Sequence, residues 1–211
     1  MDLPPPLLRT RRLVLRPPTP ADVPAHLAFL RGERDGMKDV SPRRPAAFFT
    51  AAFQRRTARR AERERRKGRG LSLLVFRRGR PGEVIGHVAF SNVVRGAAQS
   101  ASLGFSLGAL HRGKGLMTES LRAALACAFG PLRLHRVQAA HMPRNRASGR
   151  VLRRLGFRRE GLARDYLLID GRWEDHVLTG LVRPRWRPDP ADPAAVAAAG
   201  GGACPRGKPR R

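Results

Sequence analysis

A glycine-rich turn between an expected strand and an expected helix constrains the fold of this chain more than any other feature. Residues 102–107 have the pattern of a β-strand, and residues 116–129 place small and apolar side chains on one face of a helix. Between them, Gly113 and Gly115 allow positive φ angles and a close approach to a ligand. The first amides of a helix carry a partial positive charge. The turn therefore predicts an anion cradle, most naturally for a phosphate or pyrophosphate.

Two cations, Arg112 and Lys114, would add donors to this cradle. The spacing of glycine and lysine over residues 108–114 also approaches a nucleotide-binding P-loop, and Asp170 follows an apolar strand as a magnesium-site aspartate would. Gly115, however, occupies the position of the Ser or Thr whose hydroxyl holds Mg²⁺. Asp170 is better explained as the first residue of an Asp-Gly turn. The pattern therefore favours an anion-binding turn over a nucleotide hydrolase.

The remaining patterns alternate between helix and strand, which predicts a mixed α/β domain. Thr19 followed by proline is typical of a helix start, and Asp170-Gly171 is typical of a two-residue hairpin turn. In chain order we expect a strand at 13–16, helices at 20–30 and 45–66, strands at 71–76, 84–90 and 102–107, a helix at 116–129, a strand at 136–140, a helix at 147–155, and hairpin strands at 166–169 and 173–181.

The expected helix at 45–66 is unusually rich in arginine. Its apolar face is expected at Phe49, Phe53, Thr57 and Ala61, which recur every four residues. The chain holds 43 lysine and arginine residues against 16 acidic ones, a formal net charge of +27. Such an excess favours a polyanionic neighbour such as RNA, with contacts that weaken in salt. The alternative is that the arginines of this helix simply face solvent. The arginines of the expected helix are at positions 55, 56, 59, 60, 63, 65 and 66.

Proline-rich stretches mark the two ends of the chain. We expect residues 1–186 to form one domain, with the folded unit beginning near residue 7. Residues 187–211 carry an alanine run, three successive glycines and a Pro-Arg-Gly-Lys-Pro-Arg-Arg end. This composition predicts a disordered, Pro/Ala/Gly-rich basic tail.

Several protein classes are excluded by composition. No apolar run approaches the roughly 18–20 residues that a membrane-spanning helix needs, and the first residues lack the charged and apolar regions of a signal peptide. The two cysteines, Cys127 and Cys204, are too few for a disulfide framework or a multi-cysteine zinc site. We therefore expect a cytoplasmic protein without a membrane partner or a metal.

A combination of motifs resembles the GNAT superfamily of acetyl-CoA-dependent N-acetyltransferases. The superfamily pattern consists of a strand, Arg-Gly-Lys-Gly-Leu at 112–116, a helix, a strand, Pro-x-Asn-x-x-Ser at 143–148 and Leu-Gly-Phe at 155–157. Further segments are similar to its RimJ branch, which acetylates the N-terminal alanine of the fifth small-subunit ribosomal protein. These segments are residues 90–96, 113–117, 164–171 and 175–179.

The resemblance implies an α/β GNAT fold, with a central mixed, mostly antiparallel sheet whose middle strands splay and which helices flank. It implies acetyl-CoA as cosubstrate, no metal, and direct acetyl transfer in a ternary complex to the N-terminal alanine of a ribosomal protein. The arginine-covered helix would then lie on the acceptor side, where it could contact ribosomal RNA. Alternatives stay open: a GNAT enzyme for another protein N-terminus, a lysine or a small amine, or a basic RNA-binding factor without activity.

The resemblance also assigns site residues. The implied cofactor-binding residues are Phe105, Ser106 and Leu107 along the pantetheine arm, Arg112, Gly113, Lys114, Gly115 and Leu116 at the pyrophosphate, and Asn145 and Ser148 on the pantetheine side. Ser148 is a candidate acid for the leaving thiolate, and a hydroxyl that merely caps a helix is its alternative. Tyr166, the only tyrosine, is the second candidate acid or a packed sheet residue.

The general base is not assigned by the sequence. Asp175 lies in a hairpin with His176 and could accept a proton, orient the acceptor ammonium or pair with an arginine. Four histidines elsewhere stand alone in the sequence, and we expect them to be structural or surface residues. They are His87, His111, His135 and His141. The oligomeric state is also left open.

Overall fold

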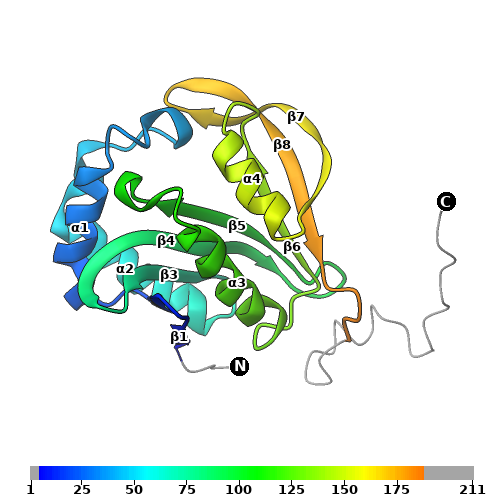
Figure 1. The fold of residues 1–211 in the computed structure, drawn as a ribbon, viewed down its shortest axis with the longest axis horizontal. Helices are drawn as coiled ribbons and strands as arrows, with labels where there is room; N and C mark the ends of the chain where they lie inside the picture. The colour runs from blue at the N-terminus through cyan, green and yellow to red at the C-terminus, as the bar shows by residue number, and fades with distance from the viewer. Residues whose placement is uncertain (1–4, 188–211) are drawn as a thin grey trace, which may run out of the picture.

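The computed structural model describes residues 5–187, and these build one eight-stranded sheet of order β1-β2-β3-β4-β5-β6-β8-β7 (Figure 1). All neighbouring strands are antiparallel except β5 and β6. The strands are β1 (Leu8–Arg9), β2 (Leu13–Arg16), β3 (Leu71–Arg77), β4 (Arg80–Val94), β5 (Ser100–Leu107), β6 (Arg136–His141), β7 (Arg158–Ile169) and β8 (Arg172–Val182). The helices are α1 (Val23–Gly32), α2 (Ala51–Arg66), α3 (Leu116–Phe129) and α4 (Arg146–Arg154).

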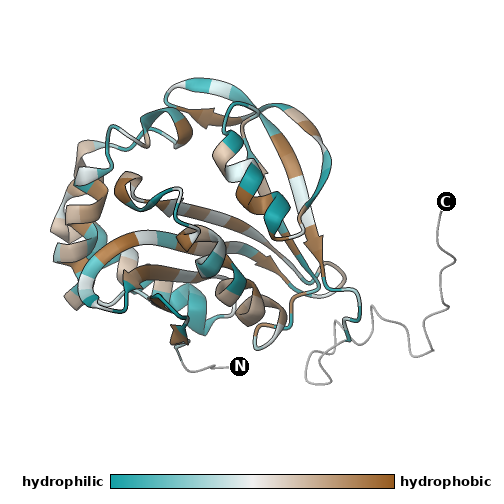
Figure 2. Cartoon of the chain, in the orientation of Figure 1, coloured by the Kyte–Doolittle hydropathy of each residue, from teal (hydrophilic) through white to brown (hydrophobic). Residues whose placement is uncertain are grey.

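The two faces of the sheet carry different hydrophobic cores, because side chains alternate along each strand. On β3, Leu73 and Val75 belong to a large core that includes α3, whereas Leu74 and Phe76 belong to a smaller core with Phe29 of α1. Helices α3 and α4 therefore cover one face, and α1 and α2 cover the other (Figure 1). The central strands are the most hydrophobic part of the chain, and α2 is largely hydrophilic (Figure 2).

Helix α3 packs as the sequence predicts. Leu121, Ala124 and Ala128 are fully buried, and Met117 is 6% exposed. This stripe covers the sheet directly behind the glycine turn, so the helix begins where its buried face first meets the strands. The expected boundaries at 116 and 129 are confirmed.

The middle strands splay, as expected for a GNAT fold. Strands β5 and β6 pair only at Ser100–Arg136, Ala101–Val137 and Ser102–Gln138. Beyond Ser102 the two strands part, while β5 continues to pair with β4 up to Leu107. The parted half leaves one edge of residues 103–107 without a neighbouring strand, between the two halves of the sheet in Figure 1.

The hairpin at the C-terminal side has the expected turn. Asp170 and Gly171 have φ angles of 44° and 86°, as a two-residue turn with two positive φ angles requires. Asp170 is therefore a turn residue, and the P-loop interpretation loses its magnesium aspartate. Strand β7 begins at Arg158, earlier than expected, and contains a register shift between Ala163 and Leu167.

The expected helix at 45–66 is wrong at its N-terminal end. Residues Ala46–Phe49 form a separate 3₁₀ turn, and Thr50 is extended. Helix α2 begins at Ala51 because the Thr50 side chain accepts a hydrogen bond from the Phe53 amide at 3.3 Å, which makes Thr50 its N-cap. The cap breaks the apolar repeat that the sequence pattern had extended across it.

The buried face of α2 differs from the expected one for the same reason. Gln54 and Ala58 are 2% and 5% exposed, whereas Thr57 is exposed. Gln54 Nε2 donates to the Phe48 carbonyl at 2.7 Å, so a polar side chain anchors the helix on the preceding turn. The expected apolar face of Phe49, Phe53, Thr57 and Ala61 is therefore rotated by about one residue.

No helix among residues 5–187 is long and apolar enough to span a membrane. The expected tail at 187–211 lies, apart from Arg187, outside the described residues.

Candidate functional site

The glycine turn leads into α3 with a backbone that only glycine adopts readily. Gly113 and Gly115 have φ angles of +76° and +73°, and Gly115 is the N-cap of α3. A Cβ at Gly113 would meet nothing within 4 Å, and one at Gly115 would meet only Arg12 Nη2 at 3.6 Å. The glycines are therefore needed for backbone conformation rather than for space.

The turn presents free backbone donors. The amides of Gly113, Lys114 and Gly115 make no hydrogen bond within the described residues. The first amides of α3, starting at Leu116, have no intrahelical acceptor because of their position in the helix. These N–H groups and the positive end of the helix dipole can hold an anion, as the sequence predicts.

Arg112 contacts two other segments of the protein in this structure. Its Nε donates to the Leu107 carbonyl at 2.9 Å, and its Nη2 lies 3.2 Å from Glu33 Oε2. Glu33 Oε1 also accepts from the Ala109 amide at 2.9 Å. Arg112 thus ties the end of β5 to the turn, and in this structure its guanidinium is occupied by protein acceptors.

The other side of the turn is anchored by Arg12, which the sequence analysis did not single out. Arg12 Nε lies 2.7 Å from Glu119 Oε2, and its Nη1 donates to the Lys114 carbonyl at 3.0 Å. Burial raises the pKa of Glu119, but hydrogen bonds from Thr10 and Arg12 together lower it below its ordinary value. Lys114 Nζ donates to the Leu110 carbonyl at 2.8 Å. Arg12 therefore neutralises the charge of Glu119, which lies in the first turn of α3 beside the free amides.

The predicted pantetheine residues lie on the parted half of β5. Phe105 packs against the α3 core, Leu107 is 8% exposed, and Ser106 faces the opposite side of the sheet. The three residues lie between the glycine turn and the splay point at Ser102. They form an open strand edge to which an extended chain could bind.

Asn145 and Ser148 lie at the start of α4, beside β6. Asn145 Oδ1 accepts from the Ser148 amide at 3.1 Å, so Asn145 is the side chain that caps the helix. The Ser148 hydroxyl is half-buried and makes no hydrogen bond within residues 5–187. It is not engaged in capping and is free to donate to a ligand.

Tyr166 and Asp175 lie farther along the β7–β8 hairpin. The Tyr166 ring is 45% exposed and lies 5.6 Å from the ring of buried His176. Asp175 Oδ1 accepts from the Asp165 amide at 3.0 Å, where Asp165 has a φ of 45° within the register shift of β7. Asp175 thus stabilises a bulge. Tyr166, Asp175 and Ser148 do not line the cavity on the α1/α2 face of the sheet.

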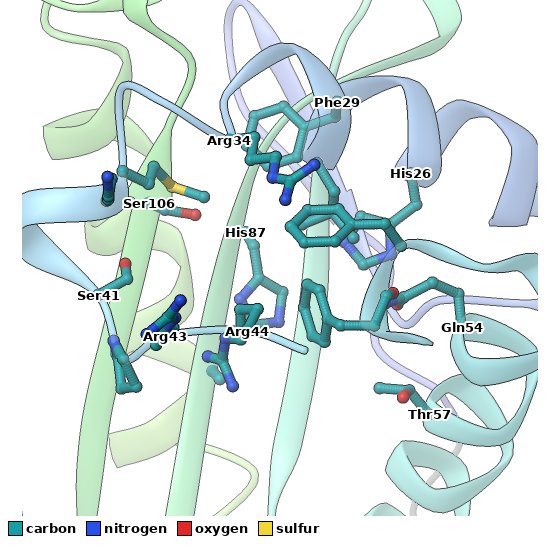
Figure 3. A pocket seen from close by; sticks show the side chains of 18 of the residues that line it. His26, Phe29, Arg34, Ser41, Arg43, Arg44, Gln54, Thr57, His87 and Ser106 are labelled. Carbon is teal, nitrogen blue, oxygen red and sulfur yellow. The ribbon is translucent and has the colours of Figure 1, made fainter. Parts of the chain in front are cut away.

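A cavity of about 840 Å³ opens on the α1/α2 face of the sheet (Figure 3). It exists because small or polar side chains form this face of β3, β4 and β5, where the α1/α2 core does not reach. These floor residues are Ser72, His87, Ala89, Gly104 and Ser106. Phe105 and Ser106 line both the cavity and the parted edge of β5, so the cavity and the open edge share a boundary.

Two histidines face each other at the bottom of the cavity. The rings of His26, from α1, and His87, from β4, are 6.5 Å apart (Figure 3). Burial, with the charges of His26 and Arg44, lowers the pKa of His87 to about 4, and burial also lowers the pKa of His26. His87 was expected to be structural or superficial. Because side chains alternate along a strand, buried Val88 indicates that His87 points to the opposite face of the sheet. His26, however, is too distant in the sequence for the pair to be recognised.

The cavity is rimmed by unpaired cations from the segment between α1 and α2. Its lining includes Arg34, Lys38, Arg43 and Arg44, together with two carboxylates, Asp35 and Asp170. None of these six side chains forms an ion pair within the described residues. The cavity is therefore electropositive.

The β7–β8 hairpin is tied to this cationic segment. Arg144, just before α4, forms an ion pair with Glu174 of β8, and its Nη2 donates to the Asp39 carbonyl at 3.3 Å. Both halves of the splayed sheet thus contribute to the cavity mouth. Among the described residues, no cluster of His, Cys, Asp and Glu could hold a metal ion. Burial raises the pKa of Cys127, which lies inside α3.

Comparison with known families agrees with this geometry. A family model described as an acetyltransferase (GNAT) domain matches residues 12–158. The chain belongs to the GNAT acetyltransferase family. The mixed, mostly antiparallel sheet with its flanking helices is thus the GNAT fold that the sequence motifs indicated.

Curated relatives include ribosomal-protein acetyltransferases. The ribosomal protein uS5-alanine N-acetyltransferase of Escherichia coli strain K12 is 53% identical over 106 residues, which cover 50% of this chain and 55% of that protein. The GNAT chain therefore spans about half the length of that relative. A probable N-acetyltransferase of Bacillus subtilis, YjcK, is 34% identical over 178 residues, which cover 84% of this chain and 98% of that protein.

Solved structures extend the likeness over most of the chain. A ribosomal-protein-S5-alanine acetyltransferase from Vibrio fischeri superposes with a TM-score of 0.83 at 29% identity, covering 87% of this chain and all of that one. Mycobacterium smegmatis RimJ in complex with CoA-disulfide has a TM-score of 0.77 at 28% identity, covering 93% and 94%. The GNAT resemblance therefore includes RimJ-type proteins.

Proposed function

We propose that this GNAT protein transfers an acetyl group from acetyl-CoA to the N-terminal amine of a protein, specifically to the N-terminal alanine of ribosomal protein uS5. The observation that carries the proposal is the free-amide turn at 113–116 beside the parted edge of β5, with an open cavity on the far side of that edge. The names of the E. coli and V. fischeri relatives support the choice of acceptor.

The residues present fit a CoA thioester. The free amides of residues 113–116 would hold the pyrophosphate, with Arg112, Lys114 and Arg12 shaping the turn. The open edge at 105–107 would pair with the pantetheine amides in the manner of an added strand. Asn145, whose side-chain oxygen is used in the cap, keeps its amide N–H groups for the same arm.

Acetyl-CoA supplies the acetyl group as an activated thioester. Direct transfer forms a bond from the amine nitrogen to the acyl carbon and breaks the bond from that carbon to sulfur. The amine loses one proton and the sulfur gains one, so the protein must accept a proton on one side and hold one on the other. An α-amino group, with a pKa of about 7.7–8.0, deprotonates far more easily than a lysine at about 10.4. A weak base or a water suffices for such an acceptor.

We assign the proton for the leaving sulfur to Ser148 Oγ, which is half-buried at the start of α4 and free of hydrogen bonds to the described residues. Tyr166, whose hydroxyl is similarly free, is the second candidate. Asp175 accepts from the Asp165 amide through Oδ1, so Oδ2 is the oxygen that would act on the acceptor side. Comparing Ser148→Ala with Tyr166→Phe separates the candidates, because loss of the donor lowers kcat by about 10²–10⁴-fold.

The direct test is intact-mass spectrometry of a ribosomal-protein extract that lacks N-terminal acetylation, incubated with this protein and acetyl-CoA. The proposal expects one added acetyl group on a single alanine-starting small-subunit protein, uS5. Acetylation of several unrelated N-termini, of lysines or of small amines would contradict the narrow acceptor while keeping the acetyltransferase. Binding of RNA without any acetylation would favour the non-enzyme alternative.

A further partner, ribosomal RNA, is favoured by the outer face of α2. The side chains of Arg55, Arg59, Arg60 and Arg63 are exposed and form no ion pair within the described residues, whereas Glu62 pairs with Arg65 and Arg66. Exposed arginines on one helix can neutralise the phosphates of a nucleic acid through charge alone.

Salt separates this docking surface from the acetylation site. Acetylation of ribosome-associated uS5 should fall steeply between about 50 and 200 mM salt, and acetylation of a short uS5 peptide should change little. Changing Arg59 and Arg63 to glutamine should reduce the first dependence and leave the second unchanged. Equal salt dependence for both substrates would contradict an RNA contact.

A further inference from the structure

We propose that Arg44 makes the acceptor cavity selective for protein N-termini that carry an acidic side chain at their second or third position. The inference rests on the proposed function, because it assigns the cavity to the acceptor peptide. It adds a specificity-determining residue that the acetyl-transfer step itself does not require.

Arg44 points into the cavity beside His87 (Figure 3). Its guanidinium stacks over the Phe48 ring, 4.9 Å from the ring centroid, which fixes its direction. It forms no ion pair or hydrogen bond within the described residues. Arg44 is exposed toward the cavity mouth, and partial burial of its side chain lowers its pKa. A guanidinium without an ion-pair partner attracts a carboxylate that reaches it.

His87 gives the anion a second, neutral neighbour. Its lowered pKa keeps the imidazole uncharged near pH 7, and the pKa of His26 is lowered as well. A neutral imidazole can donate one N–H to a carboxylate oxygen. The ring-stacked Arg44 and the imidazole of His87 thus provide a cation and a hydrogen-bond donor in one place, as recognition of a carboxylate needs.

The rest of the lining adds to the preference for an anion. Arg34, Lys38 and Arg43 surround the mouth, and only Asp35 and Asp170 oppose them. An acceptor with lysine or arginine directly after its amine would meet repulsion, whereas one with glutamate or aspartate would be attracted. The whole chain is basic, and here cations without an ion-pair partner among the described residues gather around a cavity that reaches the open edge of β5.

The sheet register sets the distance between the amine and the acidic side chain. His87 lies directly opposite Ser106 in the β4–β5 pair, and Ser106 borders the open edge where transfer would occur. Neighbouring strands are about 4.8 Å apart, and an extended peptide rises about 3.3 Å per residue. An amine at the open edge of β5 therefore places the side chain of its second or third residue near Arg44.

The test uses the full chain, acetyl-CoA and pairs of eight-residue peptides that start with alanine and differ only by Glu or Gln at the second or third position. The measured quantity is the ratio of kcat/KM for the Glu peptide to that for the Gln peptide. We expect a ratio of about 3 to 5, as a charge pair with an exposed partner gives. In Arg44→Gln the ratio should fall to near 1. Arg78→Gln, which removes an equal charge in the β3–β4 turn outside the cavity, should keep it.

Charge reversal gives a result that misfolding cannot imitate. Arg44→Glu should prefer peptides with Lys over those with Glu at the same position, inverting the wild-type order. A wild-type ratio near 1, or an unchanged ratio in Arg44→Gln, would overturn the inference and leave the acetyltransferase intact. Faster acetylation of free acidic amino acids than of any peptide would overturn the peptide as occupant. Acetylation of no peptide would remove the proposed function and this inference together.

Discussion

On the α3 face of the sheet, a large hydrophobic core lies beside a turn whose backbone conformation requires two glycines. On the α1/α2 face, a core of five buried residues gives way to a cavity of about 840 Å³. The first face is built from regular elements and offers backbone amides, which suit the constant phosphate of a cofactor. The second is built from irregular turns and offers side chains, which can be changed to suit an acceptor. The contrast suggests that cofactor binding and acceptor choice are separately adjustable.

The largest expected effect lies at the glycine turn. Gly115→Asp places an anion among the free amides and imposes a side chain at a φ of +73°, so acetyl-CoA binding should weaken by more than about 100-fold. Gly79→Asp makes the same charge change in the β3–β4 turn, where no neighbour lies within 4 Å, and should bind normally. Isothermal titration with acetyl-CoA measures both. Normal binding by a folded Gly115→Asp would mean that the turn is not the phosphate site.

The two cores can be compared with adjacent residues of β3. Leu73 and Leu74 are both fully buried but belong to the α3 core and the α1/α2 core, respectively. Leu73→Ala should lower the free energy of unfolding by about 4 kcal/mol, and Leu74→Ala by about 2 kcal/mol, because the smaller core beside a cavity relaxes more easily. Urea denaturation of both variants tests this order. The reverse order would show that the cavity side is the more rigid one.

His87, on the cavity face, should make stability depend on pH between 6.5 and 5. Because the pKa of His87 is about 4 in the folded protein and about 6.5 when unfolded, the unfolded chain binds more protons between these values. The free energy of unfolding should therefore fall as pH decreases from 6.5 toward 4. The titration of His87 should lower it by about 2 kcal/mol at pH 5. Replacing His87 by glutamine should flatten the dependence between pH 6.5 and 5, measured by urea unfolding. An unchanged slope would show that His87 titrates normally.

A smaller effect is expected where β2 anchors the turn. Arg12→Gln removes the cationic partner of the Glu119 carboxylate beside the free amides, so the Kd for acetyl-CoA should rise by about tenfold. Arg11→Gln removes an exposed charge next to it and should change the Kd by less than about twofold. Equal Kd values for the two variants would mean that Arg12 positions nothing in the turn.

The same contrast explains what could be predicted from the sequence. The glycine turn, the stripe of α3 and the Asp170-Gly171 turn depend on local backbone rules, and each was confirmed. The cavity depends on a cap at Thr50 that moves the face of α2, and on two histidines that meet only in the folded sheet. Local patterns do not contain such long-range contacts.

Arg12 and Glu33 illustrate the same limit at the glycine turn. Arg12 and Glu33 hold the turn through partners that lie 107 and 76 positions away, Glu119 and Ala109. Nothing in the sequence around either residue marks it. The expected cations Arg112 and Lys114 were placed correctly along the chain, yet their side chains serve the turn itself. Which donors remain free is decided by tertiary hydrogen bonds.

The most direct test of the account is a crystal structure of this protein with a bisubstrate compound that joins CoA through an acetyl bridge to an alanine-starting peptide. The account predicts the pyrophosphate on the amides of residues 113–116, the pantetheine along the open edge of residues 105–107, and the peptide in the cavity between α1 and α2, near His87 and Arg44. A peptide that leaves on the α3/α4 face, or a CoA portion bound away from the glycine turn, would contradict it.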